Sequence, residues 1–482
     1  MAKTSDIDFE AIRQGLQQLP RAPHHGKGTN IQRENVLIVP NHRAAIDPDR
    51  ALVVGNRGVG KSFWTAVLSD SDARAFVAKT FKELATVDAV VGFNASDRVE
   101  TIAPTKNALD EALKSRGNPD ALWRAVLLRA AMDQGVAVPK DVDKQSFSRQ
   151  VEWVIDHGED VDRIITALDD AYVAKRRKLV LVFDELDRLG TDWQTKRTLT
   201  AALLERALAA RSFRAIRLKL FMRRDQFEDP RLFQFADGSK LKNQRVDLEW
   251  STSDLYDLLF KWLAEKDASQ KAFATLFATM QKRTTRTSAD VQENVVKAIA
   301  GEFMGAGAKQ GRVYTWLPLH LADARNETSP RTFLTAWREA ALRDPAPTKR
   351  AVDHLGIHEG VRKASADRLE ELYEDYAWIK LALNPLRGQQ VPMERSALKN
   401  LWRTKKTASE ILQSSTAAKK LPPVQLDSAH TGGGDQEGAL LEDLVAIGIV
   451  EVRPNEKVNV PDIFRLEAGI KRKGGVPAPP SR

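Results

Sequence analysis

The chain has 482 residues, of which 42% are hydrophobic and 29% charged, a balance typical of a globular protein that buries a large core. Lys and Arg number 74 against 65 Asp and Glu, so the net charge of +9 permits an acidic partner such as nucleic acid without requiring one. No cysteine is present, which excludes disulfides, zinc–thiolate sites, iron–sulfur clusters and cysteine nucleophiles. At about 150 residues per domain, the length suggests about three domains.

The first 36 residues predict a polar N-terminal arm, with a helix followed by a loose basic stretch. The start of the chain, MAKTSDID, lacks the apolar segment of a signal peptide. No apolar run approaches the roughly 20 residues that a membrane helix needs. We therefore expect a cytoplasmic protein without a membrane partner.

The most informative stretch is ALVVGNRGVGKS, residues 51–62, which fits the phosphate-binding pattern G-x-x-x-x-G-K-[ST]. The apolar run 52–54 predicts a buried parallel strand, and apolar residues at helical spacing in 63–68 predict a helix. Glycines let backbone N–H groups close around phosphate oxygens, and the helix N-terminus adds a positive dipole end. The alternative is a glycine-rich turn that merely precedes a helix. The expected nucleotide-binding residues are Gly55, Asn56, Arg57, Gly58, Val59, Gly60, Lys61, Ser62 and Phe63.

Within this loop, Lys61 is expected to reach the β- and γ-phosphates and Ser62 to bind Mg²⁺. Further along, residues 88–96 predict a second core strand, and residues 97–177 predict a helical insertion into the core.

A second acidic motif, KLVLVFDELDRL, follows the insertion at residues 178–189. The apolar run 179–183 predicts a strand that ends at Asp184 and Glu185. Asp184 is expected to hold Mg²⁺ through water, and Glu185 to polarise the attacking water as a general base. The alternative is a strand that ends in a solvated acidic turn. For the nearby Asp187 we favour a capping or ion-pair role.

The next elements predict the rest of an α/β core that ends near residue 265. They are a helix over 193–210, a strand over 215–222 that ends near Arg223 and Arg224, a strand around 246–250, and a helix opened by a capping box at 251–254. Strands that alternate with helices predict a parallel sheet with both faces covered. The core is thus expected to span 37–265.

Beyond the core, residues 266–345 predict a helical lid, in which Ser329 caps a helix that begins at Pro330 and Arg331. Residues 346–482 predict a separate C-terminal domain. Its expected elements are a helix over 368–383, a helix near 393–402, a loop or linker over 413–437, another helix, and a hairpin of strands at 447–453 and 457–461. Helices followed by a hairpin predict a winged-helix-like module.

Together these motifs resemble those of the AAA+ ATPase superfamily: GNRGVGKS is similar to Walker A and LVLVFDELD to Walker B. Arg223 or Arg224 stands where sensor 1 lies, and Arg331 where the sensor 2 arginine lies. An arginine at sensor 1 departs from the usual Asn, Ser or Thr and is more like the STAND ATPases. The whole set also resembles bacterial conflict ATPases of phage defence and the ORC/Cdc6-type ATPases, which pair AAA+ with a winged helix.

The resemblance implies an ATP- and Mg²⁺-dependent ATPase that acts as a switch or motor on DNA or a partner protein, in antiphage defence or DNA metabolism. Catalysis would rest on Glu185, Lys61, Arg331, Arg223 and Arg224. The alternatives are a solvent-exposed Arg331 at a helix start, and Arg223 and Arg224 in ion pairs with Asp225 or Glu228.

The resemblance also implies a homo-oligomer with a trans arginine finger, for which Arg231, Arg211 and Arg214 are candidates. DNA contact through the C-terminal domain is favoured by three basic clusters, at 403–406, 419–420 and 471–473, and opposed by Glu442 and Asp443 in its last helix. A second hypothesis is a nucleotide-gated scaffold that hydrolyses little ATP and recruits a separate effector protein.

Overall fold

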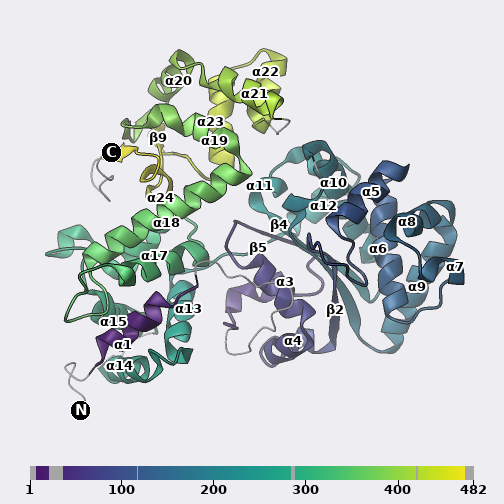
Figure 1. The fold of residues 1–482 in the computed structure, drawn as a ribbon, viewed down its shortest axis with the longest axis horizontal. Coiled ribbons are helices and arrows are strands. Elements are labelled where there is room, and N and C mark those ends of the chain that lie inside the picture. The colour runs from purple at the N-terminus through teal and green to yellow at the C-terminus, as the bar shows by residue number, and fades with distance from the viewer. Residues whose placement is uncertain are drawn as a thin grey trace. The chain divides into compact units, whose positions relative to one another are not determined.

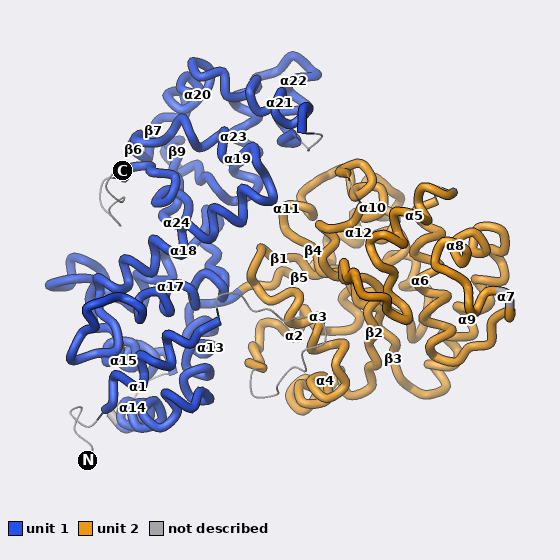
Figure 2. Tube along the Cα trace, viewed as in Figure 1, with its two compact units in different colours: residues 1–23, 250–482 blue, residues 24–249 orange. Residues whose placement is uncertain are grey.

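A computed structural model describes residues 7–20, 36–116, 118–190, 192–283, 288–418 and 422–472. The chain forms two compact units, shown in different colours in Figure 2. Unit 1 combines residues 1–23 with 250–482, and unit 2 consists of residues 24–249. The finer division into core, insertion, lid and C-terminal domain stays a prediction.

Unit 2 is built on a five-stranded sheet in the order β2-β3-β4-β1-β5, with every neighbouring pair parallel. The strands are β1 (Leu52–Gly55), β2 (Val87–Phe93), β3 (Lys178–Phe183), β4 (Ile216–Arg223) and β5 (Val246–Asp247). The four longer strands and the two-residue β5 lie where the sequence predicts them. Strand β4 separates β1 from β3, so the ends of the two motif strands flank the end of β4.

The strands are apolar on both sides because helices cover both faces of the sheet (Figure 1). In β3, Leu181 packs into the core shared with the insertion helices, whereas Val182, next along the strand, points to the other face. The helices of unit 2 are α2 (Arg43–Ile46), α3 (Lys61–Ser69), α4 (Ser71–Ala78), α5 (Lys106–Arg116), α6 (Pro119–Asp133), α7 (Lys140–Asp143), α8 (Phe147–Asp156), α9 (Gly158–Ala174), α10 (Trp193–Ala209), α11 (Arg224–Phe227) and α12 (Gly238–Asn243). The segment predicted as a helical insertion therefore forms α5–α9.

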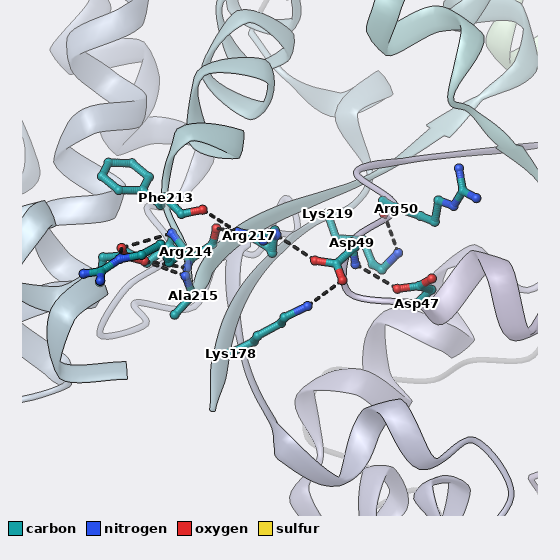
Figure 3. A network of polar contacts seen from close by, with 11 residues as sticks. Asp47, Asp49, Arg50, Lys178, Phe213, Arg214, Ala215, Arg217 and Lys219 are labelled. Carbon is teal, nitrogen blue, oxygen red and sulfur yellow. Dashed lines mark hydrogen bonds and ion pairs between the residues drawn. The ribbon is translucent and has the colours of Figure 1, made fainter. Parts of the chain in front are cut away.

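A buried lysine ties the segment before β1 to β4. Lys219 is 0% exposed, and its Nζ donates hydrogen bonds to the carbonyl oxygens of Ala45 (2.8 Å) and Arg50 (2.7 Å). Beside it, Asp49 accepts hydrogen bonds from Lys178 and Arg217, at the beginnings of β3 and β4 (Figure 3). Burial lowers the pKa of Lys219 to about 7, although nearby aspartates oppose the shift.

We expect Lys219→Met to flatten the pH dependence of the unfolding free energy above pH 7. Folding lowers the pKa of Lys219 from 10.5 to about 7, so between these values only the unfolded chain keeps the proton. This group therefore raises stability by up to about 1.4 kcal/mol per pH unit as the pH rises from 7 to 10.5, and the gain is lost over the same range as the pH falls back to 7. Urea unfolding followed by circular dichroism measures the slope. The exposed Lys82→Met should keep the wild-type slope, and a wild-type slope in Lys219→Met would contradict this account.

Unit 1 is mostly helical, and its N-terminal helix joins the helices that follow residue 250. Its helices are α1 (Phe9–Gln17), α13 (Thr252–Glu265), α14 (Gln270–Arg283), α15 (Ser288–Ala300), α16 (Val313–Leu321), α17 (Pro330–Leu342), α18 (His354–Asp375), α19 (Ala377–Leu383), α20 (Arg395–Thr404), α21 (Thr407–Ala417), α22 (Val424–Gly432), α23 (Gln436–Ala446) and α24 (Asp462–Arg465). Helix α1 is attached to α13 by a hydrogen bond to its backbone, in which the indole N–H of Trp262 donates to the Gly15 carbonyl oxygen (3.0 Å). The predicted capping box at Ser251 and Asp254 and the N-cap at Ser329 are confirmed.

The C-terminal part of unit 1 contains two small sheets. Strands β8 (Glu451–Val452) and β9 (Lys457–Asn459) form the predicted hairpin, shorter than expected, and β7 (Met393–Glu394) pairs with β9. A second, parallel pair joins β6 (Gln390–Val391) to β10 (Lys471–Arg472). The winged-helix assignment itself stays a prediction.

Two predictions for this region are wrong. The helix predicted over 368–383 is interrupted at Tyr376, whose extended backbone ends α18 and lets α19 bury Trp378 and Ile379. The predicted linker over 413–437 instead contains the end of α21 and the whole of α22. Helix α22 forms because the buried Asp443 carboxylate accepts hydrogen bonds from the amides of Gln425 and Leu426, both at 3.0 Å.

None of the helices in the described ranges has both the length and the apolar character needed to cross a lipid bilayer.

Candidate functional site

The glycine loop joins β1 to α3 at the carboxyl edge of the sheet, as the sequence predicts. Gly58 and Gly60 have positive φ angles of 82° and 104°, which glycine adopts without strain. At Gly55 a Cβ atom would lie 2.7 Å from Cγ2 of Val59, so the loop closes too tightly on itself for a larger residue. Helix α3 begins at Lys61, and the N–H groups of its first turn are directed toward the loop.

Lys61 lies across this loop. Its Nζ donates hydrogen bonds to the carbonyl oxygens of Gly55 and Asn56, both at 2.8 Å. Burial lowers the pKa of Lys61 to about 8, while the nearby carboxylate of Asp184 opposes the shift. The loop thus holds an ammonium group at the point where the motif requires one.

The acidic motif lies at the same edge. Asp184 directly follows β3, is 4% exposed, and accepts a hydrogen bond from the Ser62 hydroxyl. Burial raises the pKa of Asp184, and the hydrogen bond from Ser62 and the charge of Lys61 oppose that rise. The structure therefore brings together the three side chains that the two motifs predict to share phosphate and magnesium.

Glu185 adopts a backbone conformation that is unusual for its residue type. Its φ and ψ are 54° and 36°, in the left-handed region, whereas the residues before it continue the extended strand. A non-glycine residue in this region costs of order 1 kcal/mol and is found preferentially at functional sites. The side chain of Glu185 is about one-third exposed and lies 3.9 Å from Arg188.

The two arginines at the end of β4 are both engaged by carboxylates. Arg223 lies beside Gly55 in the β1–β4 register, and it pairs with Asp225 (3.1 Å) and Asp187 (3.6 Å). The pair with Asp225 is the ion-pair alternative that the sequence predicts for Arg223. With both carboxylates in contact, Arg223 still lies at the carboxyl edge of the sheet, next to the glycine loop. Arg224, the next residue, instead pairs with Asp247 (3.3 Å), the last residue of β5, and with Glu249 (3.4 Å), which follows that strand.

These features decide the fold class. A parallel sheet, a glycine loop between its strand β1 and helix α3, and an acidic residue at the end of β3 occur together in unit 2. The chain has the fold of a P-loop NTPase with helical domains.

Comparisons with known proteins add a structural likeness. No protein-family profile matches the sequence, and no curated protein is similar to it. Among solved structures, the ORC2 protein of Aeropyrum pernix, determined as ADPNP–ADP complexes, is similar over 90% of this chain and 94% of that chain. The identity is 13% and the TM-score is 0.40.

Arg331, the predicted sensor 2 residue, belongs to unit 1. It opens α17, and its guanidinium donates to Glu371 of α18 at 2.6 Å. Glu371 also pairs with Arg368 at 3.4 Å, along a cavity of about 210 Å³ between these helices. The Arg331 side chain is only 26% exposed and is ion-paired, so it does not extend freely into solvent, and its sensor role stays a prediction.

The three candidates for an arginine finger lie in unit 2. Arg231 pairs with Asp229 at 2.8 Å, Arg214 pairs with Asp170, and Arg211 is exposed. The role of an arginine finger stays a prediction for these residues.

The basic clusters of the C-terminal domain are only partly described. Arg403 pairs with Glu437 (3.4 Å), Arg472 pairs with Asp462 (3.1 Å), and Lys405 and Lys406 are exposed. Lys419, Lys420 and Lys473 lie outside the described residues. Arg403 is largely exposed, and ion pairs of exposed side chains are weak, whereas the Asp462 carboxylate that pairs with Arg472 is buried.

Sequence reasoning missed His42, which lies in the segment before β1. It is 1% exposed and hydrogen-bonded to Trp64 of α3 and to the backbone of Glu249. No motif or spacing indicates this residue, because both partners are brought to it only by the folded chain.

Proposed function

We propose that the chain binds ATP with Mg²⁺ at the glycine loop of unit 2 and hydrolyses it. The observation that carries this proposal is the contact between the Ser62 hydroxyl and the buried Asp184 carboxylate, next to the ammonium of Lys61. Two segments more than a hundred residues apart in sequence meet there with the three groups that a magnesium-bound triphosphate requires.

The residues present fit such a ligand. A Cβ atom added to Gly60 would meet nothing within 4 Å, so there is open space above the loop. Magnesium prefers oxygen ligands and keeps several of its waters, so Ser62 and Asp184 suffice with phosphate oxygens. In the described ranges no group of three or more His, Cys, Asp or Glu side chains is placed to hold a metal.

Each side chain then has a defined task. Lys61 exchanges hydrogen bonds to loop carbonyls for contacts with phosphate oxygens, and its positive charge stabilises the negative charge there. Glu185 accepts the proton of the attacking water, a role that its position directly after Asp184 permits. Arg223, next to Gly55, supplies further positive charge near the terminal phosphate. Bound Mg²⁺ neutralises charge on the phosphate oxygens.

The finer proposal is an AAA+-like switch or motor in the cytoplasm. Arg331 of unit 1 would respond to the nucleotide, and an arginine of a second subunit would complete the site in a homo-oligomer. The C-terminal domain would contact DNA or a partner protein, and a separate effector would carry any destructive activity in antiphage defence or DNA metabolism. The second candidate, a scaffold with little hydrolysis, shares the same nucleotide site and differs only in turnover.

The magnesium ligand is tested by Asp184→Asn. We expect wild-type protein to bind a fluorescent ATP analogue more tightly with Mg²⁺ than with EDTA, and the substitution to reduce this enhancement about tenfold, because the amide lacks the charge that attracts the metal. Titration by fluorescence anisotropy under both conditions measures it. Asp143→Asn, an exposed change at the end of α7, should behave as wild type. Equal magnesium dependence in Asp184→Asn and wild type would remove Asp184 from the site.

A further inference from the structure

The chain leaves unit 2 through a short segment that lies against the glycine loop. We call residues 246–249 the exit segment, since the next residue, Trp250, belongs to unit 1. Its strand β5 pairs with β1 at Val53 and Val54, and the amide of Leu248 donates to the Val54 carbonyl oxygen at 2.8 Å. The exit segment is therefore attached directly to the strand that leads into the loop.

A buried histidine attaches the end of the exit segment to helix α3. The Trp64 indole nitrogen lies 3.1 Å from Nδ1 of His42, and Nε2 of His42 lies 2.9 Å from the carbonyl oxygen of Glu249. Because an indole N–H only donates, Nδ1 accepts, and Nε2 therefore carries the proton that it donates to Glu249. His42 and Trp64 are each 1% exposed, so both hydrogen bonds are shielded from water.

An arginine at the start of α11, directly after β4, holds the same segment. Arg224 pairs with the carboxylates of Asp247 (3.3 Å) and Glu249 (3.4 Å). It directly follows Arg223, which lies beside Gly55 at the end of the loop strand. Glu249 is thus held at its carbonyl oxygen by His42, which α3 contacts through Trp64, and at its carboxylate by Arg224 of α11.

We infer that His42 and Arg224 are positioning residues that transmit the nucleotide state of the loop through Glu249 to unit 1. The inference rests on the proposed function. Helix α3 begins at Lys61 and carries Trp64 in its first turn, so a shift of this turn toward phosphate moves the indole and, through His42, the Glu249 carbonyl. If His42 and Glu249 did not move with the indole, a buried hydrogen bond would break and leave its polar groups unsatisfied, so joint movement is favoured.

The test uses the absence of cysteine in the chain, which allows two unique labelling sites. Ala167→Cys in α9 of unit 2 and Ala274→Cys in α14 of unit 1, both exposed, carry a donor and an acceptor fluorophore. We expect ADPNP with Mg²⁺ to change the transfer efficiency in the otherwise wild-type protein. In His42→Phe the change should be at least about threefold smaller, with the nucleotide dissociation constant altered less than about threefold. His42→Gln, whose amide restores an N–H donor, should recover the change.

Because His42 is buried, a surface variant gives an independent test. Glu249→Arg replaces a half-exposed carboxylate and repels Arg224, so it should also reduce the nucleotide-dependent change in transfer efficiency. The control Glu111→Arg, at an exposed position of α5, makes the same change of charge and should leave the change in efficiency intact. Two results would overturn the transmission inference while the proposed site stands. In one, the labelled wild-type protein binds ADPNP but its transfer efficiency does not change. In the other, the nucleotide-dependent change is equal in Glu249→Arg, Glu111→Arg and His42→Phe. If the labelled wild-type protein fails to bind ADPNP, the proposed function fails and the inference falls with it.

Discussion

Lys61→Ala is expected to weaken ATP binding by about 30- to 1000-fold, corresponding to about 2 to 4 kcal/mol for the loss of charged hydrogen bonds to phosphate. The effect is large because the ammonium lies within the loop and is held by the Gly55 and Asn56 carbonyl oxygens. Isothermal titration calorimetry with ATP and Mg²⁺ measures the dissociation constant. Lys82→Ala, at an exposed lysine of the same unit, is the matched control and should bind as wild type.

A Lys61→Ala protein that is folded by circular dichroism and binds ATP as tightly as Lys82→Ala would show that the nucleotide lies elsewhere. Both the catalytic proposal and the scaffold alternative would then lose their common basis.

Glu185→Gln is expected to lower kcat for ATP hydrolysis by about 10²- to 10⁴-fold, the range for removal of a general base. The amide keeps the size of the side chain and its position after β3, so ATP affinity should stay within about threefold of wild type. Phosphate release under saturating ATP gives kcat, and binding is measured on the same samples. Glu205→Gln, exposed on α10, should keep wild-type turnover.

This variant also separates the two functional candidates. The ATPase proposal requires wild-type turnover clearly above that of Glu185→Gln, with or without DNA. Equal and negligible turnover in both proteins, with ATP binding intact, would favour the nucleotide-gated scaffold.

The parts of the site that the sequence predicts are those encoded by continuous segments. The strand, loop and helix around Lys61 are adjacent in sequence, and a buried strand that ends in Asp184 is recognisable from its apolar run alone. Because parallel strands place their carboxyl ends at one edge, the meeting of Ser62 and Asp184 also follows from the two motifs. The structure confirms both strands and the helix that follows each.

The parts that the sequence does not predict depend on partners distant along the chain. The turn-forming residues of 413–437 predict a linker, but within this segment Asp443 fixes the first turn of α22 from 17 and 18 positions away. The contacts of His42 with Trp64 and Glu249 span 22 and 207 positions, and nothing in the local sequence indicates them. Likewise, the extended backbone of Tyr376 interrupts a helical pattern and separates α18 from α19.

The central claim is that the loop ending at Lys61 and Ser62 surrounds a triphosphate whose magnesium is held from Asp184. A crystal structure of the protein with ADPNP and Mg²⁺ tests it most directly. The account predicts phosphate oxygens within hydrogen-bond distance of Lys61 Nζ, and a metal bound by the Ser62 hydroxyl and linked, directly or through water, to Asp184. Nucleotide bound at another place, with Lys61 still bonded to its loop carbonyls, would contradict the account.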